Sequence, residues 1–289
     1  MEKLIIKSMA KELKIKQMVK QKYGEIALLK KDPSCCSSEC CCSQDSQSSM
    51  SEDYSTLEGY VAEADLNLGC GLPVQFAKIK KGDTVLDLGS GAGNDCFVAR
   101  AIVGETGSVT GLDFTDAMIA RARENAEKLG LNNVEFRQGD IEDMPVTSNK
   151  ADVIVSNCVL NLVPNKHKVF SEVYRVLKPG GHFSISDIVL EGELPAKWKE
   201  VAELYAGCVS GAIQKSEYLG IIKEAGFKNI ILQKDKTIVI PDEILAGYLS
   251  AEEIVEYKNG KTRITSITVY AEKPAKDDRN CCEPGSGCC

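Results

Sequence analysis

Cysteines are the residues whose number and placement most clearly suggest chemistry in this chain. The sequence has 289 residues and 13 cysteines, and nine of the cysteines lie in two clusters, at residues 35–42 and 281–289. The beginning of the chain lacks the apolar core of a signal peptide, so we expect a cytoplasmic protein. In a reducing compartment, cysteines more often bind metals or exchange electrons than form structural disulfides. We expect one of those uses here.

The four other cysteines lie in sequence that looks folded, and their neighbours divide them into two kinds. Cys96 falls on the apolar side of an expected helix, where a cysteine is most often a small buried residue. Cys70 and Cys208 stand beside glycines in "NLGCGLP" and "YAGCVSGA", and Cys158 follows an apolar strand in "VSNCVLNLVP". These three settings do not look like packed interior.

A glycine-rich turn follows the first apolar strand. In "VLDLGSGAGND", at residues 85–95, Gly89, Gly91 and Gly93 stand at alternate positions. Glycine lets backbone amides approach a ligand without side-chain interference, and ligands bind at the carboxyl ends of strands in doubly wound sheets. The spacing is not G-x-G-x-x-G, so the turn alone does not indicate a dinucleotide.

Acidic residues end the next two expected strands. Asp113 stands where an acid receives a ribose diol, and Asp140 with Ile141 forms a polar–apolar pair suited to the edge and face of an adenine. Three successive strand ends therefore offer groups to one adenosine-like ligand.

Alternating strand and helix patterns predict the elements that position these residues. This regular alternation with short loops is typical of a doubly wound α/β fold, a parallel sheet with helices on both faces. A later helix and two strands predict an antiparallel strand at the sheet edge. The expected strands are 83–89, 107–114, 133–140, 152–157, 182–187, 228–235 and 264–274; the expected helices are 94–104, 116–130 (capped by Asp116, closed by Gly130), 165–181 (stopped by Pro-Gly-Gly) and 216–227.

Charge and hydropathy exclude two kinds of partner. The net charge is −7, so we expect no nucleic acid partner. No apolar run approaches the roughly 20 residues that span a bilayer, so we expect no membrane segment. We expect a monomer.

Several of these segments together resemble a known family. "VLDLGSGAGND", "GLDFTDAMI" and "GDIEDMP" resemble the S-adenosylmethionine-dependent methyltransferases of the Rossmann-like class, over roughly residues 55–274. More narrowly, "NLGCGLP", "VSNCVLNLVP", "SDIVLEGELP" and "YAGCVSGA" are similar to the arsenite methyltransferases. The resemblance implies arsenic detoxification, with arsenite and methylated arsenicals as substrates. It implies that the cofactor S-adenosylmethionine contacts Asp87, Gly89, Ser90, Gly91, Asp113, Phe114, Met118, Asp140, Ile141 and Asn157, although Asn157 could instead cap its loop.

The resemblance also implies an arsenic site built from Cys70, Cys158 and Cys208. Trivalent arsenic is soft and thiophilic, and thiolates are the soft ligands of proteins. Once three sulfurs hold it, its lone pair can attack the sulfonium methyl directly, so no general base is needed. That agrees with a chain that has only two histidines, neither in a catalytic-looking context.

In that family an N-terminal cysteine pairs with the residue matching Cys70 during turnover. Cys35 or Cys36 is the nearest match, although the cluster offers five candidates. Cys70 closely follows the linker that carries them, so we expect the encounter to be easy, whereas Cys158 and Cys208 are anchored in the fold. A thiol reductant of thioredoxin or glutathione type would reopen the disulfide.

The predicted organisation has four parts. Residues 1–54 form an amphipathic helix that docks on the main domain by its apolar residues and leaves its lysines in solvent, followed by a Cys-rich linker. Residues 55–187 form the Rossmann-like cofactor domain, and 188–275 form a small lobe that completes the sheet and the arsenic site. Residues 276–289 form a Cys-rich tail. Two other functions remain open: a carbon methyltransferase of quinone or sterol type, and a non-catalytic arsenic- or metal-sequestering protein. The tail clusters lack the spaced pairs of zinc sites, and they could bind soft metals, exchange disulfides or be idle.

Overall fold

A computed structural model describes residues 2–28, 52–195, 198, 209 and 211–275, with side chains described from residue 12 onward. Cys35, Cys36, Cys208 and both cysteine clusters lie outside the described residues. In the described part of the chain, no helix is long and apolar enough to cross a membrane.

The predicted α/β sheet is present and has seven strands in the order β3-β2-β1-β4-β5-β7-β6. The pairings from β3 to β5 are parallel, and β7 is antiparallel to both β5 and β6. The antiparallel pairing at this edge was predicted; the structure adds that β7 lies between β5 and β6. The strands are β1 (Thr84–Leu88), β2 (Ser108–Asp113), β3 (Val134–Gln138), β4 (Ala151–Asn157), β5 (Leu177–Glu191), β6 (Lys228–Thr237) and β7 (Arg263–Glu272).

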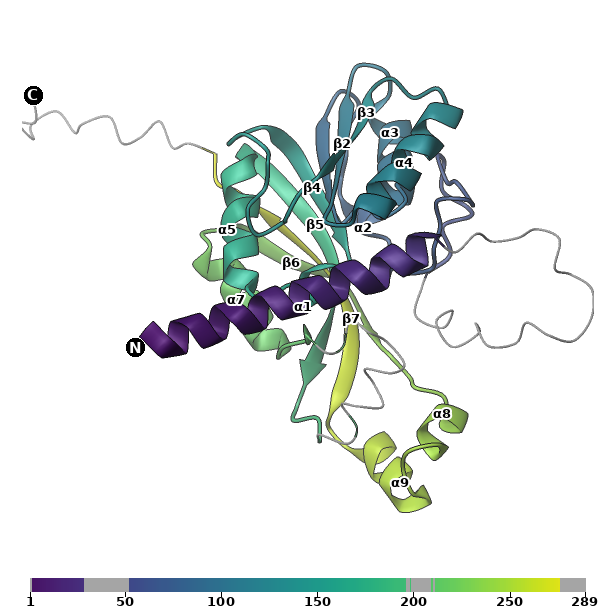
Figure 1. The fold of residues 1–289 in the computed structure, drawn as a ribbon, viewed down its shortest axis with the longest axis vertical. Coiled ribbons are helices and arrows are strands. Elements are labelled where there is room, and N and C mark those ends of the chain that lie inside the picture. The colour runs from purple at the N-terminus through teal and green to yellow at the C-terminus, as the bar shows by residue number, and fades with distance from the viewer. Residues whose placement is uncertain (1, 29–51, 196–197, 199–208, 210, 276–289) are drawn as a thin grey trace, which may run out of the picture.

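Helices cover both faces of the sheet (Figure 1). On one face, α3 (Asn94–Val103) and α4 (Asp116–Lys128) bury an apolar cluster that includes Phe97 and Ile119. On the other face, α5 (Lys166–Val176) and α7 (Lys215–Glu224) bury a second cluster that includes Phe170. The apolar faces of these helices therefore seal the sheet from water on both sides.

Several helix ends differ from the prediction, among them those of α4, α5 and α7, the last of which ends at Glu224 and not at residue 227. Thr115 is the N-cap of α4, so Asp116 is the first helical residue and not the cap. Helix α5 ends at Val176 and not at residue 181, because Leu177 already has extended backbone (φ −64°, ψ 137°) and pairs with Ala151 in the sheet. The Pro-Gly-Gly sequence lies in the irregular first part of β5, where the β4–β5 register shifts.

The long strands β5 and β7 extend beyond the sheet and carry a small lobe. The pairing of β4 with β5 stops at Asn157 and Ser186, and the rest of β5 pairs with β7, apart from an isolated bridge between Leu190 and Gln214. There Ile188 and Ile264 pack with residues around two short helices that the sequence patterns did not predict, α8 (Asp242–Ala246) and α9 (Ala251–Asn259) (Figure 1). The short helix α2 (Pro73–Phe76) was also not predicted.

The predicted N-terminal helix is α1 (Glu2–Leu28). It contacts α4 and the 3₁₀ turn η1 (Leu160–Leu162), which follows β4, and so lies across the sheet (Figure 1).

Candidate active site

A cavity opens where the sheet changes its winding direction. Strand β1 leads into α3 on one face, and its neighbour β4 leads into α5 on the other, so a crevice forms at their carboxyl ends. Gly89 directly follows β1 with φ +71°, and a Cβ there would lie 2.3 Å from the Val159 side chain, so only glycine fits. Gly91, at φ +52°, has nothing within 4 Å of its Cβ position, and its backbone faces the cavity.

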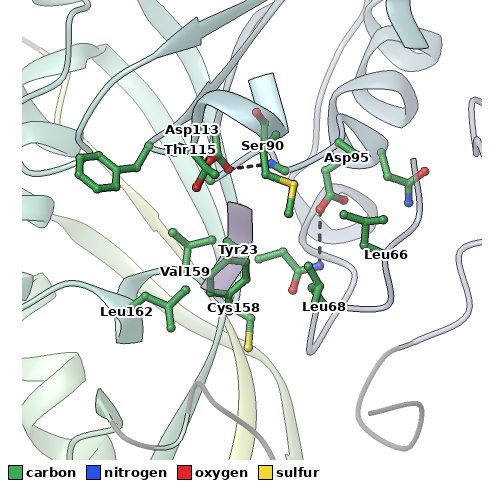
Figure 2. Close-up of a pocket in the computed structure, with 18 of the residues that line it drawn as sticks. Tyr23, Leu66, Leu68, Ser90, Asp95, Asp113, Thr115, Cys158, Val159 and Leu162 are labelled. Carbon is green, nitrogen blue, oxygen red and sulfur yellow. Dashed lines mark hydrogen bonds between the residues drawn. The ribbon is translucent and has the colours of Figure 1, made fainter. Parts of the chain in front are cut away.

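The predicted cofactor residues gather around this cavity (Figure 2). Every one of them lines it except Asp87, which is buried and off the wall. Residues that the sequence analysis missed also line it, including Tyr54 and Asp95. The predicted residues on the wall are Gly89, Ser90, Gly91, Asp113, Phe114, Met118, Asp140, Ile141 and Asn157.

Backbone hydrogen bonds fix the orientation of Asp113. Its carboxylate accepts from the Gly91 N–H (3.0 Å) and from the Thr115 N–H (2.8 Å). Burial raises the pKa of Asp113, and these two backbone bonds oppose the rise because they favour the ionised form. Asp113 therefore ties the glycine-rich turn to the end of β2, and its remaining lone pairs can face a ligand.

Two further carboxyl groups lie where β1 leads into α3: Asp87 in β1 is buried, and Asp95 in the first turn of α3 is half-buried. The Tyr54 hydroxyl donates to Asp95 Oδ1 (2.8 Å), and burial raises the pKa of Asp95 to about 6. Asp87 accepts from the Cys96 thiol (3.3 Å), and burial, followed by the charge of Asp95, raises its pKa well above the ordinary value. Burial also raises the pKa of Cys96, so this thiol stays protonated and packed, as predicted for Cys96. Asp95 could be suspected from its place after the glycine-rich turn, but a first-turn acid usually only complements the helix dipole.

The lining fits an adenosine-like ligand that carries positive charge. Ser90 Oγ is buried, lines the cavity and has no hydrogen-bond partner in the structure, so it can donate to or accept from a ligand. The wall also carries the apolar side chains of Met118 and Ile141, which suit a flat ring. Its charged side chains are one lysine, Lys16, and four acids, Asp65, Asp95, Asp113 and Asp140.

Cys158 stands directly after β4, at the boundary of two regions. It lines the cavity, and it also belongs to the apolar cluster of the lobe. Its backbone has φ +62°, a conformation that costs a non-glycine residue free energy, and its N–H donates to the Ser186 carbonyl (2.8 Å). In Figure 2 its sulfur points away from the Asp113 end of the cavity.

Cys70 joins Cys158 in this cluster, and Asn157 holds it there. The Asn157 side chain accepts from the Cys70 N–H (3.0 Å) and the Gly71 N–H (3.3 Å), and donates to the Gly71 carbonyl (2.8 Å) and the Tyr54 hydroxyl (2.7 Å). Asn157 thus both lines the cavity and holds a loop, the two roles that the sequence left open. The Ser266 hydroxyl donates to the Cys70 carbonyl (2.7 Å). Cys70 is 1% exposed and Cys158 4%, so the expectation that these two settings are not packed interior is wrong, and the Cys70 thiol is buried as deeply as that of Cys158.

The chain just after Cys208 lies near the apolar cluster that holds Cys70 and Cys158. Val209 is buried in the lobe cluster, and the buried ammonium of Lys166 donates to the Gly211 carbonyl (2.8 Å). A Cβ at Gly211 would lie 1.8 Å from the Asn161 carbonyl oxygen, so this backbone lies against the turn that follows Cys158. Among the residues that the structure describes, no three acidic, cysteine or histidine side chains form a metal site.

Neither histidine lies at the cavity. The side chain of His167 is 63% exposed, and His182 Nε2 lies 2.6 Å from the Ala77 carbonyl oxygen. The expectation of chemistry without a histidine base is therefore consistent with where both rings lie.

Comparison with known proteins places the chain in a family. Residues 79–226 match the methyltransferase domain family. The chain is 40% identical over 276 residues to the arsenite methyltransferase of Halobacterium salinarum, covering 91% of this chain and 68% of that protein. It is 38% identical over 190 residues to the mouse arsenite methyltransferase, covering 63% of this chain and 50% of that protein.

A solved structure agrees with these relatives. The crystal structure of CrArsM, an arsenic(III) S-adenosylmethionine methyltransferase from Chlamydomonas reinhardtii, matches with a TM-score of 0.60 and 36% identity. That match covers 71% of this chain and 68% of the other. The chain therefore belongs to the arsenite methyltransferase family, within the enzymes that take their methyl group from S-adenosylmethionine.

Proposed function

We propose that this enzyme methylates trivalent arsenic held by its own thiolates, as part of arsenic detoxification. The names of its relatives support arsenite as the substrate. The observation that carries the proposal is the position of Cys158, which lines the cofactor cavity and packs in one cluster with Cys70. A carbon methyltransferase would have no use for the Cys158 thiol at its cavity.

The cofactor residues have separate tasks in this proposal. Asp113 receives the ribose hydroxyls, Asp140 and Ile141 take the adenine, and the turn from Gly89 to Gly91 lets the backbone approach. Asp87 lies off the cavity wall and accepts a hydrogen bond from the Cys96 thiol of α3. When bound, S-adenosylmethionine supplies an electrophilic sulfonium methyl group.

The thiols of Cys70, Cys158 and Cys208 hold the arsenic. Each As–S bond replaces an As–O bond of arsenite, and the thiol proton leaves with the hydroxide as water. The arsenic lone pair then faces away from the sulfurs and is the nucleophile. The protein's part is positioning, which can contribute about 7–11 kcal/mol when two reactants are held at attack distance.

Methyl transfer formally oxidises arsenic by two electrons, and these must be replaced. Cys70 with Cys35 or Cys36 can supply them by forming a disulfide, which a thioredoxin- or glutathione-type thiol reopens. Because Cys70 is buried, its loop must open for this exchange. The substrate lobe over residues 188–275, the cysteine segments 1–54 and 276–289, a cytoplasmic location and a monomeric state belong to the same proposal.

One assay tests the function. Purified protein is incubated with arsenite, S-adenosylmethionine and a thiol reductant, and arsenic species are identified by mass. Methylated arsenic is the expected product. Bound but unmethylated arsenic would point to sequestration, and methylation of an added quinol without methylation of arsenite would point to a carbon methyltransferase.

The electron relay has its own test. Cys70→Ser, or deletion of residues 34–42, should stop the first cycle on inorganic arsenite. Both variants should keep activity on a substrate that arrives monomethylated and needs only two thiolates. Equal loss on both substrates in a single turnover would make Cys70 a plain third ligand.

A further inference from the structure

Three residues along one face of α1 complete the outer wall of the cofactor cavity. Lys16, Val19 and Tyr23 all line it, and their spacing of three and four residues puts them on the same side of the helix. The sequence analysis expected α1 to dock by its apolar residues with its lysines in solvent. Figure 2 shows Tyr23 among the other lining residues, including Cys158 and Val159.

Lys16 turns inward and joins α1 to the adenine end of the cavity. Its ammonium lies 2.5 Å from Asp140 Oδ2 and also pairs with Glu142, and its side chain is only 22% exposed. Burial lowers the pKa of Lys16, but the two carboxylates together raise it above its ordinary value. Glu142 in turn accepts from the Asn165 N–H (2.8 Å), so the pair is connected to the start of α5.

Polar contacts also join the described part of α1 to the rest of the chain. Lys20 pairs with Asp116 (3.1 Å), and Arg121 donates to the carbonyl of Ala27 (3.1 Å). Ala27 is the one buried residue among the described side chains of α1, while Leu13 and Met18 are 59% and 62% exposed. Exposed ion pairs contribute about 0–1 kcal/mol each, so the Lys20–Asp116 pair adds little to the docking of the described part of α1.

We infer that docking of α1 and binding of the cofactor are coupled, with Lys16 as the positioning residue that closes the adenine end. A ligand in the cavity adds contacts to Val19 and Tyr23, and it is enclosed only when Lys16 reaches Asp140. Coupling is reciprocal, so if ligand binding strengthens the docking of α1 by some factor, docking strengthens ligand binding by the same factor. The inference rests on the cofactor site and not on arsenic.

The coupling would also reach the electron relay of the proposed function. Cys35 follows the end of α1 at Leu28 by seven residues. Those residues can span at most about 25 Å. A docked α1 therefore limits how far the first relay cysteines can lie from the cavity, and it does so when the cofactor is present.

The experiment uses the full chain with S-adenosylhomocysteine and no arsenic. Calorimetry measures affinity, and hydrogen exchange with mass spectrometry measures protection of residues 12–28. In the wild type, ligand should slow exchange in α1. Lys16→Met should weaken binding by about 5- to 50-fold, a usual size for linked equilibria, and abolish the slowing. Lys16→Arg should restore most of both, and Lys22→Met, an exposed lysine of the same helix, should behave as wild type.

Other results overturn the inference. Equal affinity in Lys16→Met and Lys22→Met would remove Lys16 from the site. Weaker binding without any ligand effect on α1 exchange would mean that Lys16 acts on Asp140 alone. Tighter binding in Lys16→Met would mean that Lys16 competes with the ligand for Asp140. Failure of the wild type to bind S-adenosylhomocysteine would instead contradict the cofactor assignment.

Discussion

The cofactor half and the thiol half of the active site are built in different ways. In the cofactor half, neighbouring strand ends fix one another through the backbone, as when the Gly91 N–H donates to Asp113, 22 residues away. In the thiol half, partners come from distant parts of the chain: Cys70 is held by Asn157, 87 residues away, and by Ser266, 196 residues away. The cofactor half is therefore mainly local, although Lys16 and Tyr54 reach it from more distant parts of the chain, and the thiol half is assembled only by the complete sheet.

This difference separates what the two halves decide. The local half can be shared by methyltransferases of many specificities, since its geometry depends on a strand, a turn and a helix. The assembled half depends on β5 and β7 extending beyond the sheet, and it places thiols where a soft substrate would lie. In the proposed function, the lobe would therefore set the substrate and the turn would set the methyl donor.

The largest expected effect comes from a substitution in the thiol half alone. Cys158→Ser should lower arsenite methylation by about 100-fold or more, since a hydroxyl is a hard and mostly protonated ligand. Cofactor affinity should change less than two-fold, because the cavity backbone is unaltered. Arsenic speciation by mass and calorimetry with S-adenosylhomocysteine measure the two halves separately. Cys96→Ser, which keeps a donor to Asp87, is the matched control, and near-native turnover of Cys158→Ser would contradict the site.

A change at Asn157 should affect both halves, because its side chain contacts both. Asn157→Ala leaves the Cys70 and Gly71 N–H groups without their acceptor and should lower the free energy of unfolding by about 2–3 kcal/mol. Arsenite binding and cofactor binding should both weaken. Urea denaturation and the two binding assays test this, with the exposed Asn132→Ala as control. If the cofactor affinity alone fell, Asn157 would belong to one half only.

Asp113→Ala should impair the cofactor half alone. Loss of hydrogen bonds from a charged group should weaken cofactor binding by about 1.5–3 kcal/mol. Arsenite should still bind, as seen from As–S absorbance in the ultraviolet. Asp143→Ala, an exposed acid near the same strand ends, should bind as wild type. Unchanged affinity by calorimetry would remove Asp113 from the site.

The smallest predicted effect is a pH dependence of the cofactor half. Asp95 has its pKa raised from 3.8 to about 6, mainly by burial, so it is largely ionised at pH 7 and neutral at pH 5. A cationic cofactor prefers the ionised form, so affinity should fall about ten-fold from pH 7 to pH 5. The free energy of unfolding should change in the opposite direction. A raised carboxyl pKa means that the folded state binds the proton more tightly than the unfolded state does, so the contribution of Asp95 to stability weakens as pH rises through 6.

Calorimetry across this range tests the prediction, and Asp95→Asn should flatten the affinity profile. Tyr54, Asp65 and Asp87 also surround Asp95, and the raised pKa of Asp87 acts in the same direction. A profile that keeps its slope in Asp95→Asn would assign the titration to Asp87.

The local half was also the half that the sequence could predict. Strand ends, the glycine-rich turn, Asp113 and Asp140 follow from short patterns, and the structure brings them to one cavity. Tyr54 and Lys16 were missed because each acts across a long separation, 41 residues to Asp95 and 124 to Asp140. No local periodicity marks such a residue. The burial of Cys70 was missed for the same reason, since β7 has to form before Ser266 can reach it.

That last contact sets an order of maturation during synthesis. Cys70 and Ser266 are 196 residues apart, so at ribosomal speed about 10–40 s separate their appearance. Through that interval β7 does not exist, and the thiols of the lobe lack the strand that buries them. Newly made chains are therefore exposed to oxidants, and to arsenite itself, for as long as translation lasts. Ribosome-bound chains that end before residue 263 should be alkylated at Cys70 faster than the complete protein, and equal rates would show that the lobe closes without β7.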